Sequence, residues 1–405
     1  EVMQKQDVLL ARQPIYNRQK EVHAYELLFR DNEENKATFF CDLSATSNVL
    51  LNLFTETDLE FVTCGLPAFI NFSGELLMEK PIFDPHMVVI EILEHVKITP
   101  SFIKRVIALK KVGYTIALDD VVKAPHYKPL LPYIDIVKID LPSLSEDELR
   151  QSVDYLKDFD VTLLAEKVET HEEFQLCSDL GFELFQGYFL AKPELVKGKK
   201  LNTNQISVLG LIAELQDPNI DINHVSDIIS QDPVISFKLL KLINSAAYRR
   251  TKEIDSIKSA VALLGLKRIK SWATLLALSK LDNKPDALQY IAIVRAMTCE
   301  KLANFVSSDL QNEFYTTGLL SCLDAFFDQP IDQVIESIPI KDSMRSALME
   351  RKGVQGLILQ STLLFEKGLL EQIDWKALGE LGLDGQTFND IYYECSAIAL
   401  EATAA

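Results

Sequence analysis

Ten polar or charged residues stand at or near the ends of short apolar runs in the first half of the chain. They are Glu26, Arg30, Asn71, Glu91, Asp119, Asp120, Lys138, Glu166, Glu169 and Gln186. An ionised side chain inside a buried strand is destabilising unless it is paired or binds a cation. Because most of the ten are carboxylates, we expect one acidic pocket in which a divalent metal holds the acids together.

The apolar runs predict the elements that carry these residues. The runs cover residues 21–29, 68–72, 87–93, 114–118, 134–139, 161–165 and 184–190, and residues 7–12 add an eighth run before them. Between most of them lies a helical stretch, such as residues 100–111. Short apolar strands that alternate with amphipathic helices predict βα units, and eight strands predict a barrel. In such barrels the catalytic residues lie at the C-terminal ends of the strands.

Seven short segments carry a family resemblance, in order along the chain. They are QPI at 13–15, ELLFR at 26–30, IEILE at 90–94, LDD at 118–120, KID at 138–140, AEKVET at 165–170 and QGYFLAKP at 186–193. Together they resemble the EAL domain, a TIM-like α/β barrel phosphodiesterase that hydrolyses cyclic di-GMP to linear pGpG. The resemblance extends from about residue 7 to residue 195. Seven matches at barrel spacing are a specific signal, whereas one tripeptide would mean little.

The resemblance implies metal ligands, catalytic groups, substrate contacts and a loop brace. The metal ligands would be Glu26, Asn71, Glu91, Asp119 and Asp120, the last of which recruits a second ion. The catalytic groups would be Lys138, Glu166 and Asp120, with Lys138 orienting the attacking water. The substrate contacts would be Arg30, Gln13 and Gln186, and Glu169 would brace a loop. Mg²⁺ or Mn²⁺ suits such an oxygen-rich set better than zinc does.

Residues 121–127 depart from the family pattern. The family has a glycine- and serine-rich loop here, whereas this chain reads VVKAPHY and contains Pro125, which stiffens the backbone. Lys167 likewise stands where the family has glycine. Two classes of function therefore stay open. The first is a cyclic di-GMP phosphodiesterase, which we favour. The second is a catalytically inactive cyclic di-GMP receptor or protein-interaction adaptor.

Length, composition and net charge limit the possible domain organisation and the possible functions. A length of 405 residues predicts two or three domains. The net charge of −18 argues against a nucleic-acid binder, because affinity for a phosphate backbone comes from clustered Lys and Arg. The six cysteines include no C-x-x-C pair, which is typical of reduced thiols in a cytosol. No apolar stretch approaches the ~20 residues of a membrane span, so we expect a cytoplasmic protein without membrane insertion.

The second half of the chain has helical rather than strand periodicity. We expect a barrel domain at residues 1–195, a linker at 196–205 and an all-helical domain at 206–405. Asp232 followed by Pro233 predicts a helix start, and Ser256 and Gly265 predict the two ends of another helix. Further helices are predicted at residues 269–281, 287–306, 313–327 and 353–368.

This half resembles the HDOD domain, a relative of the HD phosphohydrolases. The resemblance lies in residues 226–248, 254–272 and 314–327. An HD hydrolase needs an adjacent His-Asp pair to hold metal, and this sequence contains no such pair. Ser321-Cys322 stands where the hydrolases would have it. The resemblance therefore implies a non-catalytic signalling or interaction module.

Basic residues around Gly265 could bind a protein partner. They are Arg249, Arg250, Lys252, Lys258, Lys267, Arg268 and Lys270. In an acidic chain such a cluster could form a docking face for an anionic partner. A solvated helix surface is the simpler alternative.

Overall fold

The chain divides into two compact units, each with its own buried core. A computed structural model describes residues 8–31, 56–78, 83–94, 96–119, 127–192, 201–243, 254, 256–281 and 284–403. The first unit comprises Glu1–Phe189 with Glu366–Glu371, and the second comprises Leu190–Phe365 with Gln372–Ala405. The first unit contains the strands, and every described element of the second unit is a helix.

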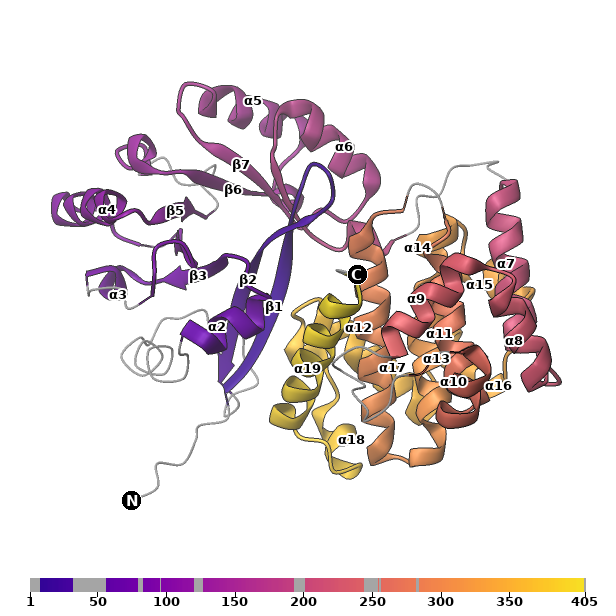
Figure 1. The fold of residues 1–405 in the computed structure, drawn as a ribbon. Helices are drawn as coiled ribbons and strands as arrows, with labels where there is room; N and C mark the ends of the chain where they lie inside the picture. The colour runs from indigo at the N-terminus through magenta and orange to yellow at the C-terminus, as the bar shows by residue number, and fades with distance from the viewer. Residues whose placement is uncertain are drawn as a thin grey trace, which may run out of the picture. The chain divides into compact units, whose positions relative to one another are not determined.

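Eight strands close into a barrel in chain order, which confirms the predicted barrel (Figure 1). The strands are β1 (Val8–Asn17), β2 (Val22–Asp31), β3 (Ala68–Phe72), β4 (Val88–Ile92), β5 (Thr115–Leu118), β6 (Ile136–Asp140), β7 (Thr162–Glu166) and β8 (Leu184–Gln186). From β2 to β8 each strand is parallel to the next. The run at 184–190 is longer than β8 because a 3₁₀ turn at Phe189–Ala191 follows the strand and is also apolar.

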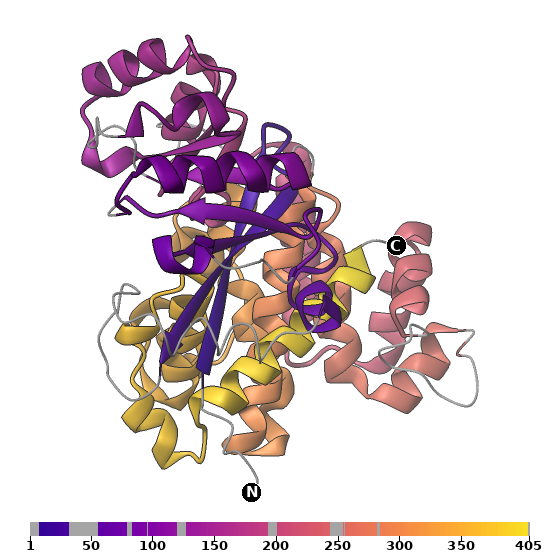
Figure 2. The ribbon, with the colours of Figure 1, turned by 90° about the vertical axis from the view of Figure 1, so that its left-hand side faces the viewer.

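Strand β1 runs antiparallel to both of its neighbours, β2 and β8, unlike the βα units of the remaining barrel. Only residues 18–21 join β1 to β2, and a parallel pair would need a crossover of a dozen or more residues. The turn passes through Lys20 at φ 64°. The two ten-residue strands extend past the shorter ones (Figures 1 and 2). The predicted strand at 7–12 ended too early because Gln13 and Pro14 interrupt the apolar run, yet both pair across this hairpin.

Five helices accompany the strands in the described part of the barrel unit. They are α2 (Glu56–Thr63), α3 (Gly74–Met78), α4 (Pro100–Val112), α5 (Glu146–Leu156) and α6 (His171–Leu180). Thr99 caps α4, and left-handed Gly113 ends it. Capping boxes start α5 at Ser145 and α6 at Thr170. Helices α5 and α6 lie on the outer side of β6 and β7 (Figure 1), so the caps help to position the ends of these strands.

The second unit is built from helices α7 to α19. These are α7 (Thr203–Gln216), α8 (Ile222–Ser230), α9 (Pro233–Ile243), α10 (Ile257–Leu264), α11 (Leu266–Leu278), α12 (Asp286–Leu302), α13 (Gln311–Leu320), α14 (Leu323–Phe327), α15 (Ile331–Glu336), α16 (Asp342–Glu350), α17 (Gly353–Glu366), α18 (Trp375–Glu380) and α19 (Gly385–Thr403). The predicted start at Asp232-Pro233 is confirmed, because Asp232 Oδ1 accepts from the N–H of Ile235 at 3.1 Å. Ser256 caps α10, and Gly265 follows its last residue, as predicted.

Residues 313–327 form two helices rather than the single helix expected. The break falls at Ser321-Cys322, between α13 and α14. Ser321 Oγ donates to the carbonyl of Gly318 at 2.6 Å and accepts from Arg295 Nη1 at 2.9 Å. Gly318 lies at a close crossing of α12 and α13, where a Cβ atom would come within 2.8 Å of Ala296 Cα. A contact from another helix therefore holds the break in place.

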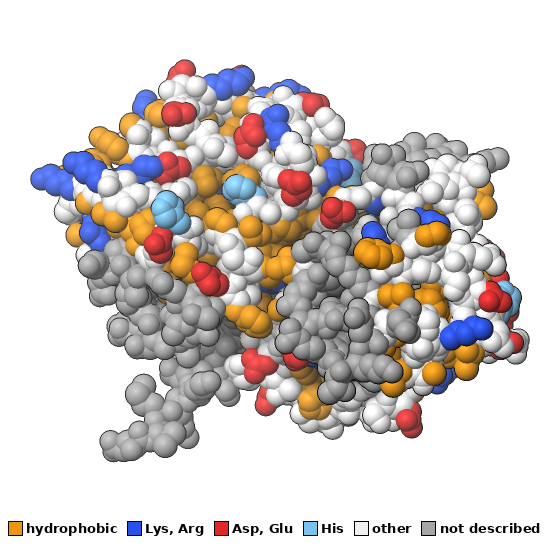
Figure 3. Space-filling view, viewed as in Figure 1, with side chains coloured by type: hydrophobic (Ala, Val, Ile, Leu, Met, Phe, Trp, Pro, Cys, Tyr) orange, Lys and Arg blue, Asp and Glu red, His pale blue; other side chains and the backbone are white. Residues whose placement is uncertain are grey.

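The surface offers no simple indication of function. On the face drawn in Figure 3, acidic and basic side chains of the barrel unit are interspersed. Among the described residues, no helix combines the length and the apolar character that crossing a bilayer requires.

Candidate functional site

An apolar layer crosses the interior of the barrel, with one residue from each strand. The layer consists of Ile15, Ala24, Phe69, Val89, Ala117, Ile136, Leu164 and Leu184, all of them buried. Side chains two residues apart on a strand point to the same face. The next inward-facing position on each strand must therefore lie directly above this layer.

A ring of polar residues lies at that next position. For the parallel strands it is two residues further along the chain, and for the reversed strand β1 it is two residues earlier. The positions are Gln13, Glu26, Asn71, Glu91, Asp119, Lys138, Glu166 and Gln186. We refer to these eight residues as the polar ring. All eight are among the predicted site residues, and the barrel places them at one level.

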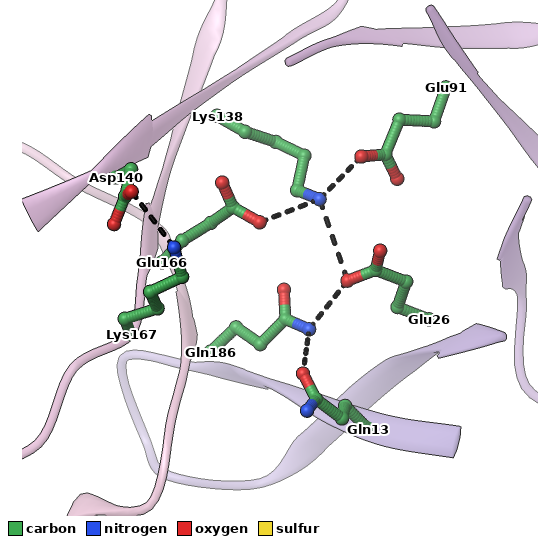
Figure 4. A network of polar contacts seen from close by, with 8 residues as sticks. All are labelled: Gln13, Glu26, Glu91, Lys138, Asp140, Glu166, Lys167 and Gln186. Atoms are coloured by element: carbon green, nitrogen blue, oxygen red, sulfur yellow. Dashed lines mark hydrogen bonds and ion pairs between the residues drawn. The ribbon is translucent and has the colours of Figure 1, made fainter. Parts of the chain in front are cut away.

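The Lys138 ammonium group lies among three carboxylates of the polar ring (Figure 4). Its Nζ is 2.5 Å from Glu91 Oε1, 2.8 Å from Glu166 Oε1 and 3.5 Å from Glu26 Oε2. Both Lys138 and Glu91 are only 1% exposed. An ammonium group has three N–H donors, so one cation holds carboxylates from β2, β4 and β7.

Gln186 connects the polar ring to the reversed strand. Its Nε2 donates to Glu26 Oε2 at 2.6 Å and to Gln13 Oε1 at 2.8 Å (Figure 4). The two hydrogen atoms of this amide thus join β8 to β2 and β1. Because β1 is antiparallel, its residue in the polar ring, Gln13, comes before its residue in the apolar layer, Ile15, along the chain.

The polar ring contains more acidic than basic groups. Burial raises the pKa of Glu91 well above its ordinary value. The charge of Lys138 lowers this pKa, whereas the neighbouring acids Glu26, Asp119 and Glu166 raise it further. The same balance, again led by burial, raises the pKa of Glu166 to about 8. Burial alone would lower the pKa of Lys138, but the surrounding carboxylates raise it, so the ammonium stays charged at neutral pH. One lysine does not neutralise these acids.

The polar ring also has unused hydrogen-bond acceptors. Asn71 Oδ1, Glu91 Oε2 and Gln186 Oε1 are buried, and none has a hydrogen-bond partner among the described residues. Buried polar atoms are normally satisfied, and oxygen ligands are those that Mg²⁺ and Mn²⁺ prefer. The donor types therefore fit a hard divalent cation.

The carboxylates do not by themselves form a closed metal site. Within the described ranges, no three His, Cys, Asp or Glu side chains converge closely enough to hold an ion. Glu26, Glu91 and Glu166 surround the Lys138 ammonium instead. The proposed second-metal ligand, Asp120, lies outside the described residues. The metal ligand set thus remains a prediction.

Three other predicted site residues lie outside the polar ring or beyond description. The Arg30 side chain, Asp120 and residues 121–126 are outside the described part of the chain. Glu169 is exposed after β7, and its backbone N–H donates to Glu173 Oε2 at 2.7 Å. Its role as a loop brace remains a prediction.

Sequence reasoning did not single out Asp140. It is the last residue of β6, two positions beyond Lys138, and accepts from Lys167 Nζ at 2.9 Å (Figure 4). The two-residue step from Lys138 was the available signal, because it places Asp140 on the same face of β6.

Comparison with known proteins identifies both units. Residues 63–193 match the EAL domain and residues 203–328 match the HDOD domain. The chain is 36% identical to protein YuxH of Bacillus subtilis, over 97% of each chain. It is 33% identical to the cyclic di-GMP phosphodiesterase CdgJ of Vibrio cholerae, over 93% of this chain and 88% of that protein. The chain is an EAL-domain protein with an HDOD domain.

Two solved structures that resemble this EAL–HDOD protein each align with only part of the chain. The manganese and cyclic di-GMP complex of Klebsiella pneumoniae BlrP1 is 24% identical, with a TM-score of 0.38 over 46% of this chain and 56% of that protein. The Bacillus subtilis YkuI protein, in complex with cyclic di-GMP and calcium, is 20% identical, with a TM-score of 0.39 over 65% and 73%. The EAL match begins at Thr63, so the hairpin that carries Gln13 and Glu26 precedes it.

The HDOD part of the protein places an arginine at the Ser321-Cys322 break. Arg295 of α12 is 1% exposed, and its Nη1 lies 2.9 Å from Ser321 Oγ and 3.0 Å from Cys322 Sγ. Within the described helices no His, Cys, Asp and Glu cluster is suited to a metal. This arrangement joins α12 to the start of α14.

The basic residues around Gly265 do not share one environment in this EAL–HDOD protein. Arg268 forms an ion pair with Glu300 and lies over the ring of Trp272. Lys270 donates to the carbonyl of Asp217 at 3.0 Å, and burial lowers its pKa. Lys258 and Lys267 are exposed, while Arg249, Arg250 and Lys252 lie outside the described residues. A protein partner at this cluster remains a prediction.

Proposed function

We propose that the barrel binds cyclic di-GMP through a divalent cation, Mg²⁺ or Mn²⁺, and hydrolyses it to linear pGpG. The observation that carries this proposal is the polar ring, which combines several acidic groups with buried oxygen atoms that lack hydrogen-bond partners among the described residues. Near full-length similarity to a cyclic di-GMP phosphodiesterase supports the choice of substrate.

The residues of the polar ring divide into ligands and groups that act on the substrate. Glu26, Asn71, Glu91 and Asp119 would hold the cation, with Asp120 recruiting a second. When bound, such cations supply a nucleophilic hydroxide and offset charge on the phosphoryl oxygens. The described residues provide the oxygen types that this chemistry requires.

Lys138 and Glu166 are the groups best suited to proton and water handling. Lys138 donates to Glu91 and Glu166, so the ammonium keeps both carboxylates in place and a positive charge beside them. A pKa of about 8 lets Glu166 exchange a proton near neutral pH, as a general acid or base must. Gln13 and Gln186, with Arg30 from the same hairpin as Gln13, would bind the nucleotide.

The HDOD unit acts in this proposal as a non-catalytic signalling or interaction module. The absence of a His-Asp dipeptide from the sequence and the placement of Arg295 against Ser321-Cys322 support that role. Control of the barrel by a protein partner would then enter through this unit.

The test is a joint measurement of metal binding and turnover on the full chain. Titration calorimetry with Mn²⁺ and assay of pGpG release would compare the wild type with Glu91→Gln and with Glu146→Gln. Glu146 is an exposed glutamate on α5 that pairs with Arg150, so it is a matched control. We expect the Glu91 variant to lose at least about tenfold in metal affinity, as metal-site changes do, and most of its turnover. The Glu146 variant should keep both.

Two results would redirect this proposal. Tight binding of cyclic di-GMP without pGpG release would make the barrel a receptor. Absence of nucleotide binding, with and without Mn²⁺, would overturn the proposal and favour an adaptor.

A further inference from the structure

Lys167 has a backbone conformation that lysine rarely adopts. It directly follows Glu166, the last residue of β7, and has φ 54°. The left-handed region is unfavourable for an L-residue with a side chain, whereas glycine adopts it freely. Such an outlier persists where the surroundings hold it, and it often marks a functional position.

The Lys167 ammonium group is anchored but remains open to solvent. Its Nζ donates to Asp140 Oδ2 at 2.9 Å. The Lys167 side chain is 65% exposed, whereas that of Asp140 is 20% exposed. Asp140 and Glu166 are paired in register at the ends of β6 and β7. The lysine thus presents a positive charge at the end of the barrel where the polar ring lies.

Asp140 has a second oxygen atom that the ion pair with Lys167 does not use. Its Oδ1 atom is buried and has no hydrogen-bond partner among the described residues. Its other oxygen atom, Oδ2, accepts from Lys167 Nζ, and this contact fixes the position of the ammonium. Burial lowers the pKa of Lys167, but the hydrogen bond to Asp140 and the charges of Asp140, Glu166 and Asp119 together raise it above its ordinary value, so the group is protonated at neutral pH.

Two lysines with different surroundings therefore lie near the ends of β6 and β7. Figure 4 shows Lys138 bonded to Glu166 and Lys167 bonded to Asp140. Lys138 is buried, and its charge is paired with carboxylates inside the barrel. Lys167 is the exposed member of the two, and its charge can reach a ligand that enters from solvent.

We propose that Lys167 binds a phosphate group of the nucleotide, with Asp140 holding its ammonium at the mouth of the barrel. This inference rests on the proposed function and adds a specificity-determining residue to it. An ammonium group is a compact point charge and a common phosphate ligand. An exposed ion pair contributes little to stability, so the Asp140 contact does not by itself account for the unfavourable backbone conformation.

Four variants of the full chain test this inference. Lys167→Gln removes the charge, Lys167→Arg keeps it, and Lys167→Gly removes both the charge and the backbone strain. Lys157→Gln is the matched control, because Lys157 is also 65% exposed and pairs with Asp154 at 2.6 Å. The measurements are the dissociation constant of cyclic di-GMP by stopped-flow titration with Mn²⁺ and the thermal midpoint of each variant.

We expect Lys167→Gln and Lys167→Gly to weaken nucleotide binding by about tenfold, the effect of losing one hydrogen bond to a charged group. Lys167→Arg and Lys157→Gln should stay within about threefold of the wild type. The glycine variant should bind less tightly while its thermal midpoint stays equal or rises, a combination that a structural role would not produce.

Two outcomes would overturn the inference in distinguishable ways. If the wild type binds cyclic di-GMP and Lys167→Gly binds it equally well, this inference alone fails. If the wild type binds no cyclic di-GMP under any of these conditions, the proposed function fails and this inference fails with it.

Discussion

The barrel and the helical unit each bury a basic side chain almost completely, but the two side chains make different contacts. Lys138 of the barrel lies among the carboxylates of Glu26, Glu91 and Glu166. Arg295 of the helical unit donates to the hydroxyl of Ser321 and lies beside the Cys322 thiol. Lys138 thus contacts three carboxylates, whereas Arg295 bonds a hydroxyl and a thiol and lies close enough to Asp324 for its charge to lower the pKa of that carboxyl.

This difference separates a ligand site from a structural brace. Around Lys138 the acids outnumber the base, and three buried oxygen atoms have no partner in the described part of the chain. Around Arg295 the contacts join α12 to the break between α13 and α14. Excess charge and unused acceptors leave the barrel prepared for a ligand, whereas the contacts of Arg295 stabilise a helix junction.

The two tryptophans allow the units to be followed separately. Trp272 and Trp375 are the only tryptophans in the chain, and they lie in α11 and α18 of the helical unit. Tryptophan fluorescence therefore reports on that unit, whereas calorimetry reports on both. We expect each of the following changes to shift the unfolding temperature of one unit and leave that of the other unit unchanged.

The largest effect is expected from Lys138→Ala without metal. Removing the cation leaves buried carboxylates unpaired, which destabilises by about 3–5 kcal/mol. Calorimetry should show a lower unfolding temperature for the barrel, while the unfolding temperature of the helical unit, followed by fluorescence, should not change. Mn²⁺ should restore part of the loss, because a divalent cation can replace the missing charge. An unchanged barrel transition would mean that Lys138 does not neutralise the acids.

A smaller effect is expected from Arg295→Met, which keeps much of the side-chain length. Loss of the hydrogen bonds to Ser321 should destabilise the helical unit by about 1–3 kcal/mol. The fluorescence transition should fall, and neither Mn²⁺ nor cyclic di-GMP should restore it. Rescue by either ligand would contradict the assignment of Arg295 to a structural brace.

A third effect is a pH dependence of the metal-free barrel. The Glu166 pKa of about 8 lies above the ~4.3 of an unfolded glutamate, so the folded barrel binds the extra proton between these values. Stability from this group is fully present below about pH 4 and is lost as the pH rises through about 8. We expect the calorimetric barrel transition to fall by several degrees between about pH 5.5 and 8.5. Glu166→Gln should flatten that trend, and an equally steep trend in this variant would assign the proton elsewhere.

Much of the barrel could be predicted because buried parallel strands read as continuous apolar runs. The run at residues 68–72 coincides with β3. The direction of β1 could not be predicted from its apolar residues, because it depends on the short connection to β2. The break at Ser321-Cys322 was also missed, since the apolar pattern of α13 continues into α14 and the contact comes from Arg295 on another helix.

The types of the site residues were visible in the sequence, but their interactions were not. Lys138 contacts Glu91 and Glu26, which lie 47 and 112 residues away along the chain. Such contacts exist only once the strands are in register. The same holds for Gln186, whose contact with Gln13 depends on the reversal of β1.

The antiparallel hairpin β1–β2 also affects how the barrel can form. It closes the barrel by pairing Ile15 with Gln186, so the last seam joins segments about 170 residues apart. A fragment that starts at Thr63, where the EAL match begins, would lack both hairpin strands and expose the edges of β3 and β8 to aggregation. During synthesis the hairpin must wait, with one edge unpaired, until the ribosome has made β8.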